Sequence, residues 1–304
     1  MGVSDKSAAK TQCSTAEASS RIWQVDSPSR LELFLQKCMP DASRESLRRV
    51  LAAGACRVDG VVRPWGYRLV PGAVVTVDPE VRISEVVPES IPVEILYEDD
   101  DLIAVNKPPG MLVHPTTRVR TGTMANALRG AGYRDIHFLH RLDRETSGVL
   151  VAAKHLPRGS PLARMFAERD VAKRYLAMTA GPVEWVERTV SLPIGRDPDR
   201  MPQWNVQADG ALAETHFRLL HRGAGGDLLE AMPVTGRTNQ IRIHTAAIGH
   251  PLLGDSAYGG APAARLFLHA WTLEIPTPEE GRRLIVAPVP EEFPGEASNL
   301  LISV

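Results

Sequence analysis

The sequence predicts an α+β protein of two domains, and three observations support that prediction. The chain has 304 residues, about twice the length of a typical domain. Segments with a helical period occur together with segments of alternating apolar and polar residues, which are typical of strands. The stretch from Arg30 to Thr76 holds eight basic and four acidic residues, whereas Asp78 to Asp101 holds nine acidic residues and one arginine. This change of charge, with three prolines in the acidic stretch, indicates a basic module linked to a larger domain.

The composition excludes several classes of protein. Hydrophobic residues make up 43% and charged residues 23% of the chain, as in ordinary globular domains, so wholesale disorder is excluded. Cys13, Cys38 and Cys56 are an odd number without C-x-x-C spacing, which excludes a disulfide framework and a cysteine-rich zinc site and fits a reducing cytoplasm. No apolar run approaches membrane-spanning length, and Met1 to Ser20 lacks the apolar core of a secretory signal. We therefore expect a cytoplasmic protein with no membrane partner.

The first elements follow from local patterns. Residues 1–26 are small and polar and are predicted to form a disordered tail. A first helix is expected over Leu31 to Leu35, after the N-cap candidate Ser29. The alternation from Cys56 to Val62 surrounds an Asp-Gly turn typical of a hairpin, and Val75 to Val77 predicts another strand.

A second helix is predicted from Ser43 to Ala53, and Gly54 ends it in the C′ position. Its apolar residues would face inward and its arginines outward, which is also the pattern of an ordinary solvated helix. Two helices followed by strands resemble the S4 RNA-binding domain, and this resemblance implies that the module binds RNA. The matching residues are Arg30-Leu31, Ser46 to Gly54, Val58-Asp59-Gly60 and Pro71-Gly72; the inward residues are Leu47, Val50 and Leu51, and the arginines are Arg44, Arg48 and Arg49.

The larger domain opens with a buried strand. Leu102 to Val105 is apolar, a Pro-Pro-Gly turn follows it, and a short strand closed by Pro115 is expected next. Further alternating strands are predicted at Val149 to Ala153 and at Ile241 to His244. The predicted boundaries are 1–26 for the tail, 27–78 for the basic module, 79–95 for an acidic linker and 96–296 for the larger domain.

The segment from His140 to Gly148, with sequence His-Arg-Leu-Asp-Arg-Glu-Thr-Ser-Gly, is the first place to look for a site. It crowds histidine, two arginines, aspartate and glutamate beside an apolar strand, an arrangement that is costly unless the charges are used. The sequence lacks a Walker phosphate loop, a kinase glycine-rich loop and the P-C-x-x-C of zinc deaminases. His244 and His250 have no third ligand near them, so we interpret them as structural or RNA-facing residues.

Five motifs in order resemble the RluA-type pseudouridine synthases, and together they span about residues 95 to 290. Asn239 stands where that family usually has histidine, and we expect this difference to alter RNA contact rather than catalysis. The motifs are Asn106-Lys107-Pro108-x-Gly110 with Val113-His114-Pro115, His140-Arg141-Leu142-Asp143-x-x-Thr146-Ser147-Gly148, Lys173-Arg174-Tyr175-Leu176-Ala177, Thr235 to His244, and Gly249-His250-Pro251 through Gly254-Asp255 to Tyr258-Gly259.

The resemblance implies a mixed, largely antiparallel sheet and the isomerisation of uridine in structured RNA. It implies that Asp143 acts as nucleophile or stabilises an electron-poor ribose, with Arg242 as its ion-pair partner. Tyr175 would stack on the flipped base or move a proton, and Arg141 would enter the space that the base leaves. The residues expected to bind RNA are Arg141, His140, Asn106, Lys107, Arg237 and Asn239 in the larger domain and Arg44, Arg48 and Arg49 in the basic module.

Three alternatives remain open at this point. Large-subunit ribosomal RNA is the expected substrate, and tRNA is the alternative. A non-catalytic RNA-binding protein could keep the same fold, but Asp143, Tyr175 and Arg242 are all present. A nucleoside or glycoside hydrolase usually needs two carboxylates, and only Glu145 lies near. Because the reaction oxidises nothing and uses no donor, we expect no cofactor and no metal, and we expect a monomer whose partner is structured RNA.

Overall fold

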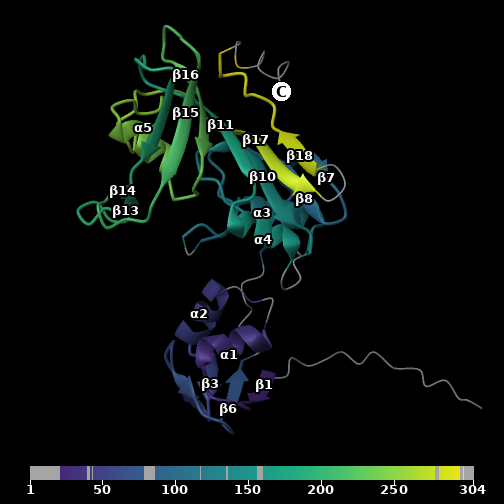
Figure 1. Cartoon of the computed structure of the whole chain (residues 1–304). Helices are drawn as coiled ribbons and strands as arrows, with labels where there is room; N and C mark the ends of the chain where they lie inside the picture. Colours follow the sequence, from purple (N-terminus) through teal and green to yellow (C-terminus); the bar gives the residue numbers. More distant parts are fainter. Residues whose placement is uncertain are drawn as a thin grey trace, which may run out of the picture. The chain divides into compact units, whose positions relative to one another are not determined.

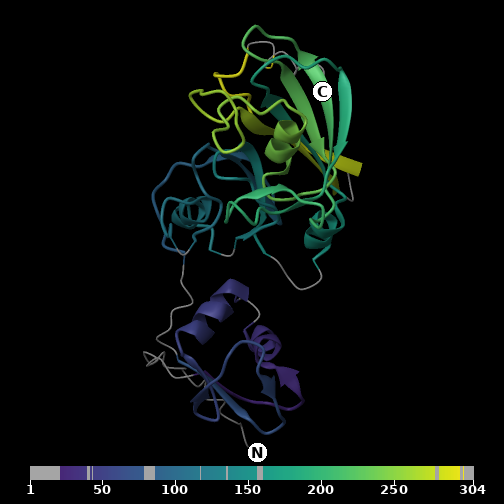
Figure 2. The same ribbon diagram turned by 90° about the vertical axis from the view of Figure 1, so that its left-hand side faces the viewer.

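The computed structural model describes residues 21–39, 42, 44–78, 86–116, 118–134, 136–155, 160–277, 281–294 and 297. The chain divides into two compact units, residues 1–85 and residues 86–304. Each unit has its own hydrophobic core, and Figures 1 and 2 show the elements of each. Within the described part of the chain, every helix is too short or too polar to span a bilayer.

The first unit packs two helices on one face of a small sheet with the strand order β1-β6-β3-β4, beside a two-stranded ladder of β2 and β5. All of its strand pairs are antiparallel. Its elements are β1 (Arg21–Gln24), β2 (Ser29–Arg30), α1 (Leu31–Cys38), α2 (Arg44–Ala52), β3 (Cys56–Val58), β4 (Val61–Val62), β5 (Arg68–Leu69) and β6 (Val74–Val77).

Most of the elements predicted for this unit are confirmed. Gly54 follows α2 with a φ of +69°, and both residues of the Asp59-Gly60 turn have positive φ, as a type I′ hairpin requires. Two predictions are wrong. Arg30 and not Ser29 is the N-cap of α1, and both residues pair with β5 in a short ladder. Arg21–Gln24 is a strand and not part of a tail, because its backbone completes the edge of β6; residues 1–20 lie outside the described residues.

The second unit is built on one ten-stranded sheet with the order β12-β15-β16-β11-β17-β10-β8-β7, in which β18 also pairs with β17 and β9 with β10. Its elements are β7 (Glu94–Glu98), β8 (Leu102–Lys107), α3 (Met124–Gly130), β9 (His137–Phe138), β10 (Ser147–Ala153), α4 (Pro161–Glu168), β11 (Ala172–Met178), β12 (Glu187–Ser191), β13 (Ile194–Arg196), β14 (Trp204–Val206), β15 (Glu214–His221), β16 (Leu228–Pro233), α5 (Gln240–Ala247), β17 (Leu268–Thr277) and β18 (Gly281–Val286).

A short parallel seam joins the two antiparallel halves of this sheet. β10 and β17 run parallel and pair through only two residue pairs, Ser147 with His269 and Gly148 with Ala270. A Cβ on Gly148 would lie 2.1 Å from the carbonyl oxygen of Ala270, so only glycine permits this approach. Ala270 also pairs with Tyr175 of β11 on its other side. β17 thus lies between β11 and β10 (Figure 1), and the start of β10 and the middle of β11 flank the same residue, Ala270.

The strands predicted at Leu102 to Val105 and at Val149 to Ala153 are confirmed as β8 and β10. The strand predicted at Ile241 to His244 is wrong, because these residues lie in α5. Ile241, His244 and Thr245 are all buried, and this i, i+3, i+4 spacing belongs to a helix, whereas a window of four residues shows only alternation.

No strand forms between Met111 and Pro115. Instead, the carbonyl oxygens of Leu112 and Val113 accept the first N–H groups of α3, which a strand would have used for pairing. The predicted linker is also shorter than expected. Glu89 donates its backbone N–H to the carbonyl oxygen of Asn126 in α3, and its carboxylate accepts the N–H of Gly122. Residues 86–95 therefore belong to the second unit, and residues 79–85 lie outside the described residues.

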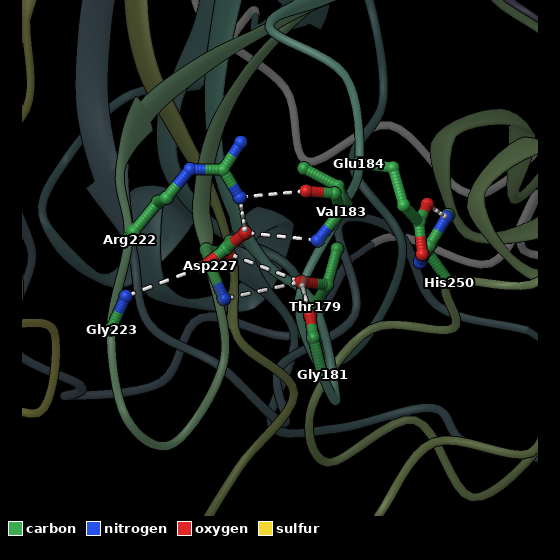
Figure 3. A network of polar contacts seen from close by, with 8 residues as sticks. All are labelled: Thr179, Gly181, Val183, Glu184, Arg222, Gly223, Asp227 and His250. Carbon is green, nitrogen blue, oxygen red and sulfur yellow. Dashed lines mark hydrogen bonds and ion pairs between the residues drawn. The ribbon is translucent and has the colours of Figure 1, made fainter.

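A buried carboxylate fixes the ends of β11, β15 and β16 (Figure 3). Asp227, just before β16, accepts the backbone N–H of Val183 at 2.9 Å and pairs with Arg222 at 3.2 Å. Thr179, just after β11, exchanges backbone and hydroxyl hydrogen bonds with Asp227. His250 contacts Glu184 at 3.4 Å beside this network. These bonds join the C-terminal end of β11 to the N-terminal end of β16, and they help to hold β11 in its place in the sheet.

Candidate active site

A pocket of about 340 Å³ lies where the elements on both sides of the seam meet. The segment before β10 forms one part of its lining, and the end of α4 with the start of β11 forms another. The turn between β16 and α5 completes it. The lining residues used below are His140, Arg141, Asp143, Phe166, Arg169, Lys173, Tyr175 and Arg237.

Among the described residues that line the pocket, Asp143 is the only one with a carboxylate. Its side chain is partly buried, and this burial raises its pKa above the ordinary value. The charges of Arg242, Arg141 and Lys107 oppose the rise, in that order of strength, and the backbone N–H of Asn239 donates a hydrogen bond to the carboxylate. The site therefore holds an acid whose ionised form is supported by three cations and one N–H group while burial works against it.

Asn239 places that N–H group. It is the N-cap of α5 and has a φ of +54°, a left-handed conformation that asparagine adopts more readily than most residues. Its side-chain Oδ1 accepts a hydrogen bond from Arg242 at 3.2 Å, and its Nδ2 donates to the hydroxyl of Tyr258 at 3.0 Å. Tyr258 in turn donates to the carbonyl oxygen of Trp204. Both ends of the Asn239 amide are thus hydrogen-bonded within the protein, and the RNA contact expected from the sequence stays a prediction.

Arg242 forms its direct ion pair with Asp255 and not with Asp143. Its Nε and Nη2 atoms bind the two Asp255 oxygens at 2.7 and 2.6 Å, and Asp255 is 1% exposed. The guanidinium also lies 5.0 Å from the centre of the Tyr258 ring. The expected ion pair between Arg242 and Asp143 is therefore corrected: Arg242 acts on Asp143 through its charge, while Asp255 fixes the position of that charge.

Tyr175 enters the pocket from β11. Opposite this point β17 carries a bulge, because Arg174 pairs with Thr272 and Tyr175 with Ala270, which leaves Trp271 as the extra residue. Its neighbours on the two adjacent strands are Ala231 and Ala270, whose small side chains leave room for the ring. Burial, with the charge of Asp143 added, raises the pKa of the Tyr175 hydroxyl, so the phenol stays protonated at neutral pH.

Lys107 is fully buried, which corrects the expectation that it binds RNA. Its Nζ donates to the carbonyl oxygens of Pro108 at 2.7 Å, Met111 at 2.8 Å and Arg144 at 3.0 Å. Three acceptors match the three N–H groups of the ammonium, although burial lowers the pKa of Lys107 to about 7. Arg144 adds a bond from its Nε to the carbonyl oxygen of Gly110. Together these bonds tie the loop that carries Asp143 to the loop after β8.

Three other predicted residues line the pocket. His140 accepts the N–H of Val151 and stacks on Phe166 at 5.6 Å, so it shapes the wall of the pocket. Burial lowers its pKa, which keeps the ring neutral. Arg141 is exposed at the mouth of the pocket, and Arg237 lines it while donating to the carbonyl oxygen of Leu212.

Asn106, which the sequence predicts to bind RNA, is not among the residues that line the pocket. Asn106 lies on β8 and donates to Glu94 of the edge strand at 2.9 Å. In the first unit, Arg48 is exposed and lies over the ring of Trp65 at 5.1 Å, while the side chains of Arg44 and Arg49 lie outside the described set. His244, interpreted from the sequence as structural or RNA-facing, is structural: its ring nitrogens contact the Thr215 hydroxyl and the Leu192 carbonyl.

Sequence reasoning missed four residues of this site. Asp255 and Tyr258 lie within the motifs, and only the pairing of Asp255 with a buried arginine reveals its role. Lys173 precedes Tyr175 by two positions, so strand alternation could have placed it in the same pocket. No local sequence signal points to Arg169, which the end of α4 brings to the pocket.

Comparisons with known proteins agree with the motifs. The family model described as RNA pseudouridylate synthase matches residues 101–247. A Bacillus subtilis protein, named as the uncharacterized RNA pseudouridine synthase YlyB, is 34% identical over 284 residues, which are 89% of this chain and 94% of that protein. The ribosomal large subunit pseudouridine synthase D of Nitrosomonas europaea is 35% identical over 289 residues, 87% of this chain and 82% of that protein.

A solved structure agrees with the fold. The human RNA pseudouridylate synthase domain containing 1 superposes with a TM-score of 0.55 at 30% identity, covering 66% of this chain and 85% of that chain. The predicted α+β class with a largely antiparallel sheet is confirmed. With a family model across the pocket and relatives above 30% identity over most of their length, the chain belongs to the RNA pseudouridylate synthase family and is an RNA pseudouridine synthase.

Proposed function

We propose that this enzyme isomerises uridine in large-subunit ribosomal RNA, with Asp143 as the catalytic carboxylate. The single observation that carries the catalytic assignment is the placement of Asp143 in the pocket, where it is the one acid among the described lining residues, together with Tyr175 and under the influence of the charges of Arg242, Arg141 and Lys107. The name of the Nitrosomonas europaea relative supports ribosomal RNA as the substrate. Such a substrate is consistent with the cytoplasmic location predicted from the cysteine usage.

The chemistry needs a carboxylate beside the ribose. The bond between N1 of uracil and C1′ of ribose breaks, the uracil turns, and its C5 bonds to the same carbon. A carboxylate that attacks C1′ or stabilises the electron-poor ribose supports this exchange. The proton leaves C5 and N1 gains one, so the product is an isomer of the substrate. Asp143 performs this work in its ionised form, which Arg242, Arg141 and the Asn239 N–H support.

The target base must leave its helix or loop, which costs a few kcal/mol of stacking. The Tyr175 ring offers a surface on which the flipped uracil can stack, and its protonated hydroxyl is available for proton transfer at C5. Arg141 is exposed at the pocket mouth, where its planar guanidinium can replace the base in the RNA. These roles follow from the position of each group around Asp143.

We further propose that the first unit binds RNA, in line with its resemblance to the S4 domain. Arg48 is exposed and lies over Trp65, and Arg63 lies over Tyr67 at 4.7 Å, so cations and aromatic rings occur together as in many RNA-binding surfaces. Because the units have separate cores, a protein without residues 1–85 should keep a folded pocket. Its RNA affinity should fall and depend less on salt, since phosphate contacts release counterions. Full affinity with the same salt slope would contradict this role.

A pseudouridine map tests the substrate. In cells that lack the gene, one or more pseudouridines should be missing from large-subunit ribosomal RNA in a carbodiimide primer-stop assay. A plasmid with the wild-type gene should restore them, and one with Asp143→Asn should not. Loss confined to tRNA would replace ribosomal RNA by tRNA as the substrate. Restoration by Asp143→Asn would show that Asp143 is not the catalytic carboxylate.

A further inference from the structure

The charges that line the pocket do not balance. Four cationic side chains, those of Arg141, Arg169, Lys173 and Arg237, line it together with the single carboxylate of Asp143. Arg141 and Arg237 belong to the segments that carry or flank the motifs. Arg169 and Lys173 come from a different part of the lining, the end of α4 and the start of β11, which we call the α4–β11 wall. The established chemistry uses neither of them.

Lys173 is a cation without a counterion. Within the described ranges, no carboxylate lies within ion-pair distance of the Lys173 ammonium group, and this group donates no hydrogen bond. The Nζ atom of Lys173 lies over the Phe166 ring, 5.7 Å from its centre. The side chain is partly buried, and this burial lowers its pKa. A partly desolvated ammonium with no fixed partner lowers its energy when an anion enters the pocket.

Arg169 supplies an independent observation, because its backbone is in an unfavourable conformation. It ends α4 with φ and ψ of +64° and +28°, the left-handed region in which helices usually place glycine. The turn itself is ordinary, since the N–H groups of Arg169 and Asp170 both bond the carbonyl oxygen of Met165. Glycine would make the same turn without strain. An arginine in that conformation beside a pocket indicates that its guanidinium is used.

We propose that Arg169 and Lys173 form an anion subsite that holds a phosphodiester group of the RNA next to the target uridine. A uridine that enters the pocket brings its two flanking phosphates with it, and these are the anions that RNA supplies in every sequence. Lys173 lies two residues before Tyr175 on β11, and both line the pocket, so one strand presents the ring and the ammonium side by side. The inference rests on the assignment of this pocket to uridine isomerisation.

The subsite would fix the ribose of the target nucleotide through its phosphate. Stacking on Tyr175 alone lets a base slide in its own plane, whereas a second contact to the backbone sets the distance between C1′ and Asp143. Contacts to phosphate carry no sequence information but set register and orientation. The α4–β11 wall would thus act on any uridine that reaches the pocket, and other surfaces would choose which uridine that is.

The test combines variants of the wall with RNA that lacks one charge. The RNA is a synthetic stem-loop that the wild-type enzyme modifies, made with a single neutral methylphosphonate on the 5′ or the 3′ side of the target uridine. The enzymes are wild type, Lys173→Met, Lys173→Arg and Arg169→Gly. Arg164→Ala is the matched control, since Arg164 is an exposed arginine of the same helix that does not line the pocket. Affinity is measured over a range of salt concentrations.

We expect Lys173→Met and Arg169→Gly each to weaken binding about tenfold and to reduce the slope of log affinity against log salt by about 0.7 to 0.9. Lys173→Arg and Arg164→Ala should keep the wild-type slope to within a few tenths. A methylphosphonate on one side of the uridine should weaken wild type and leave Lys173→Met almost unchanged, because its ammonium is already absent. Arg169→Gly should melt no lower than wild type, since glycine relieves the left-handed turn.

Two results would overturn the subsite. Equal losses from the methylphosphonates in wild type and in both wall variants would show that neither residue meets a flanking phosphate. A lower melting temperature for Arg169→Gly would show that the arginine stabilises the fold and would remove the argument from strain. In either case, pseudouridine formed by the variants would leave the proposed function in place, whereas failure of wild type to modify any RNA would contradict the proposed function itself.

Discussion

The two sides of the pocket differ in how their charges are compensated. On the side of Asp143, the charged groups are fixed by the protein: Arg242 by Asp255, and the carboxylate by the Asn239 N–H. On the α4–β11 wall, the described residues leave Lys173 and Arg169 without a carboxylate. One side is organised before substrate arrives, as chemistry requires. The other keeps charge uncompensated, as capture of an anion requires. Variants on the Asp143 side should therefore change the rate of the reaction, and variants on the α4–β11 wall should change the affinity for RNA.

The largest effect is expected for substitution of Asp143, which should lower the single-turnover rate much more than the affinity for RNA. Asp143→Asn should bring the single-turnover rate below detection and change RNA affinity by only a few fold, because the wall that captures RNA is intact. A quench assay for pseudouridine at saturating enzyme measures the rate, and filter binding measures the affinity. Substantial residual turnover would show that Asp143 is not the catalytic carboxylate. A large loss of affinity would show that the Asp143 side also contributes to RNA binding, so that the two sides of the pocket do not have separate roles.

The same variant should be more stable than wild type at neutral pH. Burial raises the pKa of Asp143 above its unfolded value, so the folded protein binds this proton more tightly than the unfolded chain. Stability from this group is present below the unfolded pKa, near 3.9, and is lost as pH rises through the folded pKa. Urea unfolding from pH 4 to 7.5 should show a gain for Asp143→Asn that grows with pH. A gain independent of pH would contradict this explanation.

The next effect separates the ring of Tyr175 from its hydroxyl. Tyr175→Phe should keep most of the binding, since base stacking contributes about 1–3 kcal/mol and the ring is retained. Its single-turnover rate should fall by about 10²- to 10⁴-fold if the hydroxyl moves the C5 proton. Tyr175→Leu, which removes both functions, is the control. A full rate for Phe would eliminate proton transfer, and a full rate for Leu would place Tyr175 outside the reaction.

Asp255 tests whether the organised side depends on its buried ion pair. Asp255→Asn leaves Arg242 without its bidentate partner, and breaking a buried pair in this way costs about 3–5 kcal/mol. We expect a clear fall in the urea midpoint and a slower chemical step, because the charge of Arg242 is no longer fixed beside Asp143. Arg164→Gln, which removes the exposed contact between Arg164 and Glu168 of α4, is the comparison and should cost less than about 1 kcal/mol. Equal costs would contradict a special role for Asp255.

The smallest effect concerns pH. Arg141 lowers the pKa of Asp143, second in strength to Arg242. Arg141→Gln should therefore move the acid limb of the single-turnover rate to higher pH, because the carboxylate then takes up a proton more readily. Arg141→Lys keeps the positive charge, so the acid limb of the rate should stay at the wild-type pH. An unmoved limb in Arg141→Gln would indicate that this exposed arginine does not influence Asp143, whatever it does to the RNA.

Sequence patterns predicted the elements whose residues carry their own signal. The helix that ends at Gly54 and the Asp59-Gly60 hairpin follow from local backbone preferences. The predicted strand at Ile241 to His244 failed, since helix and strand periods are indistinguishable over four residues and the buried face of α5 appears only over eight. Local signals alone do not show which hydrogen-bond partner a backbone segment takes. The segment from Met111 to Pro115 was expected to pair as a strand, but its carbonyl oxygens accept hydrogen bonds from the start of α3.

The motifs located the pocket, but they do not show which partners the side chains near it choose. A lysine in a motif looks like a phosphate ligand until burial shows Lys107 bound to three carbonyls. The pairing of Arg242 with Asp255 depends on a turn that brings the two side chains together. Asn239 in place of the usual histidine is explained by its φ, because asparagine and histidine are both enriched in the left-handed region. That substitution preserves the turn that directs an N–H group at Asp143.

The two-residue parallel seam has a consequence for how the enzyme folds. Ser147 and His269, which meet there, are 122 residues apart in sequence, whereas most other pairs of this sheet close over shorter loops. Contacts of such separation form late, because the entropy of closing the loop is lost before the contact repays it. On dilution from urea, helical and strand signals should therefore return before the ability to form pseudouridine. Nascent chains would form no pseudouridine until β17 has been synthesised and has reached β10.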